Sequence, residues 1–142
     1  MKRVSRSRLV AAARAAMQNA HAPYSGFRVG AALLARSGHV FVGCNVENAS
    51  YPVSLCAERA ALAAAVAAGC REFEVLVIVT TSQFPCPPCG MCRQALAEFG
   101  GDLLVVLVGS DGGCTEFRLQ DLLPEAFTPA FLMEPRPRGG EP

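Results

Sequence analysis

The chain has 142 residues, of which 51% are hydrophobic, and its formal net charge at pH 7 is +1. This length fits one domain, and the apolar fraction is sufficient for a hydrophobic core. A charge close to zero gives no electrostatic reason to expect a nucleic acid as partner. Charged residues interrupt the alanine-rich runs, so no stretch is expected to span a membrane.

Seven cysteines are many for a chain of this length. Their odd number, and the absence of an apolar run at the amino terminus, argue against a secreted framework of disulfides. Thiols that serve as metal ligands suit a reducing compartment, so we expect a cytoplasmic protein. Cys44, Cys70 and Cys114 are most simply small, buried hydrophobic residues.

Apolar periodicity and the positions of glycine and proline predict the elements in chain order. A helix over 9–20, capped by Ser5 or Ser7, is followed by a hairpin of strands over 28–35 and 39–44. The following elements are expected to be a helix over 56–68, a strand over 72–80, a helix over 89–99, strands over 103–108 and 114–118, and a helical turn over 119–123.

This order predicts an α/β fold in three layers, α/β/α, with a mixed five-stranded sheet and helices on its faces. We expect one domain over residues 1–133. Proline, arginine and glycine dominate residues 134–142, which are expected to form a disordered tail.

The cysteine spacing indicates a metal site. Cys89-x-x-Cys92 is a chelating pair, because two intervening residues let both sulfurs reach one tetrahedral metal, and Cys56 offers a third thiolate. Three protein ligands and an open position are typical of catalytic zinc. Glu58 lies two residues from a ligand and can carry protons beside the metal. Attack of the activated water on an amidine-like carbon, with loss of ammonia, is hydrolytic deamination.

Both cysteine segments are expected to begin helices, whose free N–H groups and positive dipole ends favour thiolates. Arg59 or Arg93 could also donate a hydrogen bond to a sulfur, and Arg59 is the better candidate. The alternative is a structural zinc site, which is normally closed by four ligands. Cys86 is the candidate for a fourth ligand, and His21 is a less favoured one.

A polar loop over 43–52 directly precedes Cys56. It is dense in side chains that can hydrogen-bond to hydroxyl groups, namely Asn45, Glu47, Asn48, Ser50 and Tyr51. Such a composition also suits an ordinary loop, but the position of this loop beside the metal motif favours substrate binding.

The chain resembles the small cytidine deaminases that have an all-cysteine zinc site, over about 22–129. The ligand-x-Glu and Pro-Cys-x-x-Cys signature is that of zinc-dependent base deaminases. The loop with Asn45-x-Glu47 makes the resemblance more specific. The motifs are Pro23-Tyr24-Ser25 with Phe27, the runs 29–33 and 43–51, Cys56-Ala57-Glu58-Arg59, the run 88–94 and the run 122–127.

The resemblance implies a cytidine-deaminase-like fold and a role for each matching position. Cys56, Cys89 and Cys92 would bind one Zn²⁺ per subunit, and Glu58 would shuttle the proton. The implied substrate-binding residues are Asn45 and Glu47 at the ribose 3′-hydroxyl, Phe27 against the pyrimidine, the Ala57 N–H at O2, and Ala49, Tyr51 and Phe127.

The resemblance further implies deamination of cytidine and 2′-deoxycytidine in pyrimidine salvage, by a homotetramer in which Tyr51 and Phe127 reach neighbouring sites. Pro87 departs from the family, which often has serine there, and we expect activity to survive. Alternatives are deamination of another cytosine nucleoside such as a blasticidin-type antibiotic, deamination of a polynucleotide, which the charge disfavours, and a non-enzymatic structural zinc protein.

Overall fold

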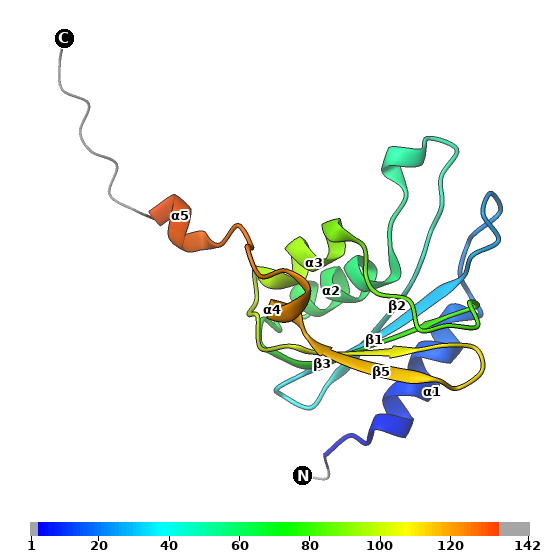
Figure 1. The fold of residues 1–142 in the computed structure, drawn as a ribbon, viewed down its shortest axis with the longest axis horizontal. Helices are drawn as coiled ribbons and strands as arrows, with labels where there is room; N and C mark the ends of the chain where they lie inside the picture. The colour runs from blue at the N-terminus through cyan, green and yellow to red at the C-terminus, as the bar shows by residue number, and fades with distance from the viewer. Residues whose placement is uncertain (1–2, 134–142) are drawn as a thin grey trace.

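A computed structural model of the chain describes residues 3–133, and the expected tail over 134–142 lies outside this part. Five strands form one sheet in the order β2-β1-β3-β4-β5 (Figure 1). Only β3 and β4 are parallel, and the other neighbours are antiparallel, so the mixed sheet is confirmed. The strands are β1 (Val29–Ala35), β2 (Val40–Cys44), β3 (Phe73–Thr80), β4 (Leu104–Val108) and β5 (Cys114–Arg118).

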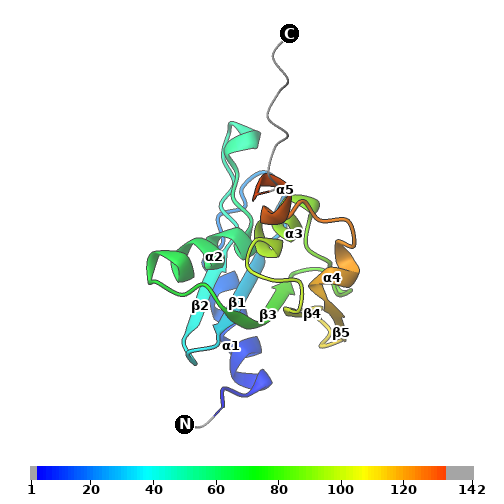
Figure 2. The same cartoon turned by 90° about the vertical axis from the view of Figure 1, so that its left-hand side faces the viewer.

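Helices cover both faces of this sheet (Figures 1 and 2). Helix α1 (Arg6–Met17) packs on one face, and α2 (Ala57–Ala67) and α3 (Gly90–Ala97) lie over the other. The three-layer prediction is therefore confirmed. The remaining helices are the short η1 (Tyr51–Val53), α4 (Leu119–Leu122) and α5 (Pro129–Met133). Within residues 3–133, no helix combines the length and apolarity that crossing a bilayer requires.

Helix α1 begins at Arg6 and ends at Met17, so each end lies three residues earlier than in the predicted range of 9–20. The Ser5 side chain accepts a hydrogen bond from the Arg8 N–H at 3.3 Å, which confirms Ser5 as the N-cap. At the other end, the N–H groups of Asn19 and Ala20 bond to carbonyls three residues back. The apolar pattern predicted the wrong bounds because it reports the buried face of a helix, whereas hydrogen bonds set its ends.

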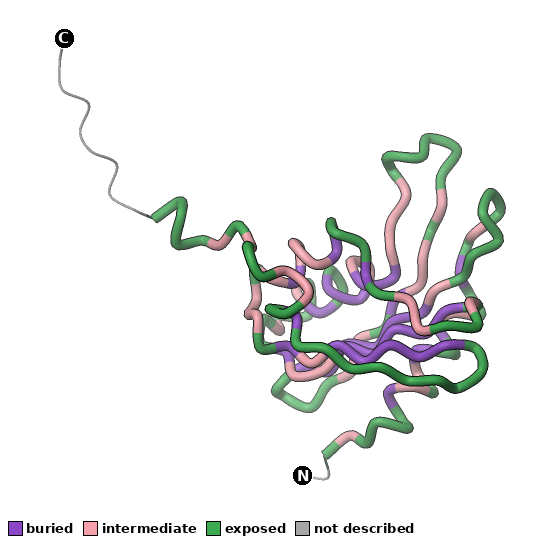
Figure 3. The backbone as a smooth tube through the Cα atoms, viewed as in Figure 1, coloured by how far each residue is buried: buried purple, intermediate pink, exposed green. Residues whose placement is uncertain are grey.

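The alternation of side chains along the strands builds two cores, one on each face of the sheet. In β3, Leu76 and Ile78 point to the face under α2 and α3, whereas Val77 and Val79 point to the face under α1. These central residues are almost fully buried (Figure 3). The two-sided burial explains why β3 is a nearly continuous apolar run.

Cys44, Cys70 and Cys114 are predicted from the sequence to be buried, and none of the three is fully buried. All residues of β5 are exposed, including Cys114, so its prediction as a buried residue is wrong. Cys44 and Cys70 are half-buried. An edge strand has no neighbour on one side, and within residues 3–133 no helix is packed closely enough over β5 to bury its side chains.

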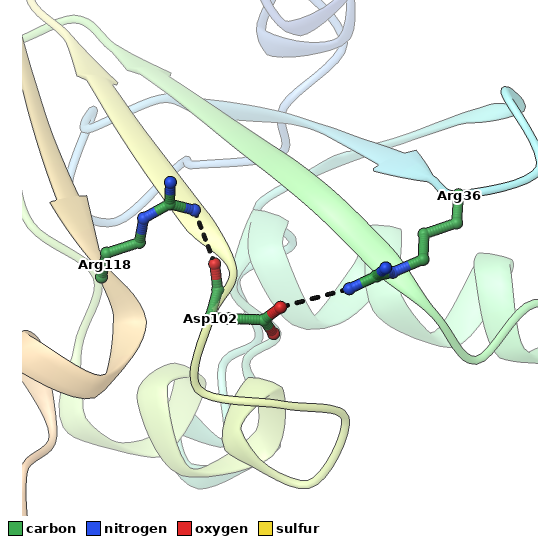
Figure 4. Close-up of polar contacts among 3 residues, drawn as sticks. All are labelled: Arg36, Asp102 and Arg118. Atoms are coloured by element: carbon green, nitrogen blue, oxygen red, sulfur yellow. Dashed lines mark hydrogen bonds and ion pairs between the residues drawn. The ribbon is translucent and has the colours of Figure 1, made fainter.

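At the end of the sheet where β1 ends and β4 begins, Asp102 joins two strands (Figure 4). Its carboxylate pairs with Arg36, which follows β1, at 3.1 Å, and its carbonyl accepts a hydrogen bond from Arg118 of β5 at 2.8 Å. Both charged partners are exposed, so we assign this ion pair less than about 1 kcal/mol.

Gly43 of β2 lets α2 approach the sheet closely. A Cβ added there would lie 2.4 Å from the Ala57 carbonyl oxygen and 2.5 Å from the Ala61 nitrogen. Both contacts are with backbone, which cannot rotate aside. Since Ala57 is the first residue of α2, Gly43 fixes the position of the helix start that carries Cys56 and Glu58.

We expect Gly43→Ala to destabilise the protein by at least about 2 kcal/mol, because α2 must shift to relieve the collision. Urea denaturation measures this as a lower midpoint. Gly90→Ala is the matched control, because an added Cβ there meets nothing within 4 Å. Equal midpoints for the two variants would contradict the tight contact between Gly43 and α2.

Candidate active site

Three cysteine sulfurs meet where α2 and α3 begin. Cys56 is the N-cap of α2, Cys89 is the N-cap of α3, and Cys92 lies in the first turn of α3. The Sγ–Sγ distances are 3.8 Å from Cys56 to Cys89 and 3.5 Å from Cys89 to Cys92, and all three sulfurs lie within 4.8 Å of one another. Sulfurs about 2.3 Å from a tetrahedral zinc would be about 3.8 Å apart. The cluster therefore fits one zinc ion.

The surroundings of the cluster favour thiolates. Two helix amino termini direct free N–H groups and partial positive charge toward these residues. Hydrogen bonding to the Cys92 thiol, and then to Arg59, lowers the pKa of Cys56 to about 5. The Arg59 Nη2 atom lies 3.7 Å from the Cys56 sulfur and 3.4 Å from the Ser54 carbonyl oxygen. Arg59 is thus the arginine that reaches a sulfur.

Among the described residues, Arg93, the alternative, forms no hydrogen bond with a sulfur. Its Nε and Nη1 atoms donate hydrogen bonds to the carbonyls of Pro88 and Leu122, both at 2.8 Å. It therefore ties the loop before Cys89 to α4. The other open alternatives concern the ligand set. Cys86 directs its thiol to the Phe84 carbonyl, 3.4 Å away, and lies outside the three-sulfur cluster, as does the exposed His21.

Glu58 lies in the first turn of α2 and is only 5% exposed. Its Oε2 atom is 3.5 Å from the Cys92 sulfur, so the carboxyl group is adjacent to the cluster. Burial raises the pKa of Glu58 above the ordinary value for a glutamate, and the charge of Cys56 acts in the same direction. A buried carboxyl group beside a metal site, with such a pKa, is suited to accept and return a proton.

A cavity of about 260 Å³ opens beside the cluster. This volume is close to the lower end of small-ligand pockets, which span about 300–1,000 Å³, and suits one small molecule. Seven of the residues predicted for the site line it, namely Phe27, Asn45, Glu47, Cys56, Ala57, Glu58 and Cys89. Cys92 is fully buried and does not line the cavity. The chemical groups expected at the metal, base and sugar therefore converge on one space.

Asn45 and Glu47 have polar atoms that are already partly used by the protein. The Asn45 amide accepts a hydrogen bond from the Val29 N–H at 2.8 Å and donates one to the Phe27 carbonyl at 2.7 Å. Glu47 accepts hydrogen bonds from the N–H groups of Tyr24 and Ser25, at 3.0 and 3.1 Å, and from the Ser25 hydroxyl. Both side chains therefore hold the segment that carries Phe27 as well as lining the cavity.

Three predicted substrate-binding residues are not brought to this cavity. Ala49 and Tyr51 lie on the loop that projects beyond the body of the molecule, and Phe127 lies just before α5 on another projecting segment (Figures 1 and 3). Tyr51 is 70% exposed and Phe127 is 56% exposed. The Tyr51 ring contacts Tyr24 edge-on, with centroids 5.8 Å apart. Within one chain neither Tyr51 nor Phe127 lines the cavity, so their expected contact with the site of a neighbouring subunit stays a prediction.

The cavity also has walls that the sequence did not identify. Ile78 and Thr80 line it at the end of β3, and Ser54 lies just before the cysteine segment. Thr80 is 2% exposed, and its hydroxyl accepts a hydrogen bond from the Ser82 N–H. A signal for Thr80 was present, since it is the polar residue that ends an apolar strand. The carboxyl end of a parallel strand is the usual location of sites in α/β folds.

Comparisons with known proteins agree with this geometry. The family model described as "Cytidine and deoxycytidylate deaminase zinc-binding region" matches residues 3–108. A cytidine deaminase of Sporosarcina psychrophila is 44% identical over 122 residues, which are 85% of this chain and 90% of that protein. The crystal structure of cytidine deaminase from Burkholderia pseudomallei has a TM-score of 0.84 and 49% identity, covering 87% of this chain and 100% of that chain.

One similar protein has another substrate in its name. A blasticidin-S deaminase of Bacillus cereus is 29% identical over 108 residues, which are 70% of this chain and 76% of that protein. This identity is well below that of the cytidine deaminase of Sporosarcina psychrophila.

Proposed function

Because the chain belongs to the cytidine and deoxycytidylate deaminase family and is a hydrolytic enzyme of it, we propose that it deaminates cytidine and 2′-deoxycytidine to uridine and 2′-deoxyuridine. The observation that carries this proposal is the cavity that joins the three-cysteine cluster and Glu58 to Asn45 and Glu47. The reaction exchanges the amino group for oxygen from water and releases ammonia. Supply of uridine from cytosine nucleosides would be its role in pyrimidine salvage.

The metal end of the cavity would perform the chemistry. Cys56, Cys89 and Cys92 would hold one zinc ion per chain, which would lower the pKa of a coordinated water and so supply the nucleophile. Glu58 would accept one proton of the attacking water and deliver it to the ring nitrogen, and would then pass the second proton, from the hydroxyl group added to the ring carbon, to the departing amine. Arg59 would offset part of the negative charge of the sulfurs.

The opposite end would recognise the nucleoside. Phe27 would pack against the pyrimidine, and the Ala57 N–H, at the start of α2, would donate to the base oxygen O2. Glu47 and Asn45 would bind the ribose, chiefly its 3′-hydroxyl. A carboxylate has about four acceptor positions, and three of those on Glu47 are used, which leaves one for a sugar hydroxyl. Pro87 lines the cavity and would offer the base only its carbonyl.

Ultraviolet absorbance of zinc-loaded protein tests the proposal, with cytidine, 2′-deoxycytidine, cytosine and CMP as parallel substrates. We expect the absorbance of the two nucleosides to change with release of ammonia, and cytosine and CMP to remain intact. No reaction with any of the four, from protein with one zinc per chain, would refute the proposal. Blasticidin S would then be the next substrate to test, because the relative from Bacillus cereus bears that name.

We also propose a homotetramer with shared active sites. The support is the set of apolar side chains that one chain leaves exposed on its two projecting segments, namely Tyr51, Val53, Phe127, Phe131, Leu132 and Met133. Apolar surface of this kind marks contact sites, and a second copy would let Tyr51 and Phe127 close a neighbouring cavity. Light scattering should give four times the chain mass, and a monomer that is active at the same concentration would contradict shared sites.

Cysteine chemistry supports a cytoplasmic location. All seven cysteines lie within residues 3–133 and are free thiols there, which is typical of proteins in a reducing compartment. A polynucleotide deaminase remains disfavoured by the near-neutral charge. A structural zinc protein is disfavoured because Cys86 does not complete the sulfur cluster.

A further inference from the structure

We propose that Ser25 is a positioning residue that couples sugar recognition to base recognition, an inference that rests on the proposed function. Its hydroxyl group donates a hydrogen bond to Glu47 Oε2 and accepts one from the Phe27 N–H at 3.0 Å. One hydroxyl group therefore bridges the carboxylate that would bind the ribose and the residue that would pack against the pyrimidine.

The bridge completes a framework that holds both polar backbone groups of Phe27. Ser25 binds the Phe27 N–H, and the Asn45 amide binds the Phe27 carbonyl at 2.7 Å. Because Glu47 follows Asn45 by two residues, the Ser25–Glu47 and Asn45–Phe27 hydrogen bonds tie one loop to the other at neighbouring points. The Phe27 ring therefore cannot shift far along the cavity unless Ser25 or Asn45 releases its backbone.

The same bridge fixes the direction of the Glu47 carboxylate. The N–H groups of Tyr24 and Ser25 occupy both acceptor positions of Oε1. The Ser25 hydroxyl occupies one position of Oε2, so the remaining free acceptor position of Glu47 is on Oε2. The Ser25 hydroxyl is also the main reason that the pKa of Glu47 lies below its ordinary value, with further contributions from the Ser25 and Tyr24 N–H groups and from His21. Ser25 thus favours the ionised form of the carboxylate and fixes its orientation in the wall of the cavity.

The test compares Ser25→Ala with wild type on cytidine and on 2′,3′-dideoxycytidine, which lacks the 2′- and 3′-hydroxyl groups but keeps the 5′-hydroxyl. We expect Ser25→Ala to lower kcat/KM for cytidine by about three- to tenfold, mainly through KM, as loss of the hydrogen bond to the partly exposed Glu47 carboxylate implies. For the dideoxynucleoside the loss should stay below about twofold. Ser25→Thr retains a hydroxyl group and should restore most of the cytidine activity.

The chain offers a matched control at Ser82. Its hydroxyl accepts a hydrogen bond from the Phe84 N–H at 3.2 Å, the same local turn that Ser25 makes with Phe27, but no carboxylate partner is found for it among the described residues. Ser82→Ala should therefore leave kcat/KM for both substrates unchanged. In a Glu47→Gln background, Ser25→Ala should add less than about twofold, because its effect passes through the carboxylate.

The possible outcomes separate the two proposals. An active wild type with an unchanged Ser25→Ala variant would overturn the coupling and leave the proposed function intact. Equal losses on both nucleosides would mean that the hydroxyl acts only through Phe27, which also overturns it. A wild type inactive on both would overturn the proposed function and this inference together. Thermal unfolding midpoints within about 2 °C of wild type would show that the variants remain folded.

Discussion

Replacing Glu58 with glutamine is expected to lower kcat for cytidine by about 10²–10⁴-fold while the bound zinc is retained. Glutamine has the shape of glutamate but cannot accept the proton of the attacking water at neutral pH. Glu58 lies beside the sulfur cluster without belonging to it, with Oε2 3.5 Å from the Cys92 sulfur. Its loss therefore removes proton transfer and leaves the three sulfurs in position.

The measurement is kcat from the absorbance assay, together with zinc content per chain and the unfolding midpoint. Burial raises the pKa of Glu58, so the folded state disfavours its charge, and the neutral amide should not destabilise the fold. Glu98→Gln is the matched control, because Glu98 is exposed at the end of α3. Turnover of Glu58→Gln within about tenfold of wild type would refute the assigned proton role.

Most of the sheet could be predicted from the sequence because burial leaves a direct pattern in it. The apolar run of β3 and the glycines and prolines between elements gave the order of the strands and helices. The N-cap positions of Cys56 and Cys89 also follow from local sequence. The metal cluster was predictable for the same reason, since the Cys89-x-x-Cys92 spacing already constrains two of its three sulfurs.

The sugar end of the cavity was harder to predict, because it depends on contacts between segments that are distant in the chain. Glu47 is held by Tyr24 and Ser25, which lie 23 and 22 residues before it. Nothing in the local sequence of either loop indicates this pairing. The same limit applies to Tyr51 and Phe127, whose positions on projecting segments depend on loop conformation and on what covers them.

Replacement of a proposed metal ligand is expected to have the second large effect on activity. The chain also contains other cysteines, which serve as controls. Cys89→Ser should reduce the zinc content from one ion per chain to nearly none and lower kcat/KM by at least about 10³-fold. The reason is that a hydroxyl group is a poor replacement for a thiolate, and the two remaining sulfurs cannot hold the ion alone. Cys114→Ser, on the exposed edge strand, should change neither quantity.

Cys86→Ser separates a catalytic from a structural zinc site. A catalytic site with three sulfurs and an open position does not need Cys86, whose thiol faces the Phe84 carbonyl, so this variant should retain its zinc. A structural site closed by four cysteines requires the opposite result, namely zinc loss comparable to that of Cys89→Ser. Zinc content of the purified variants, measured after dialysis against a weak chelator, distinguishes the two. Zinc retained by Cys89→Ser but lost from Cys86→Ser would contradict the ligand set from which the mechanism is built.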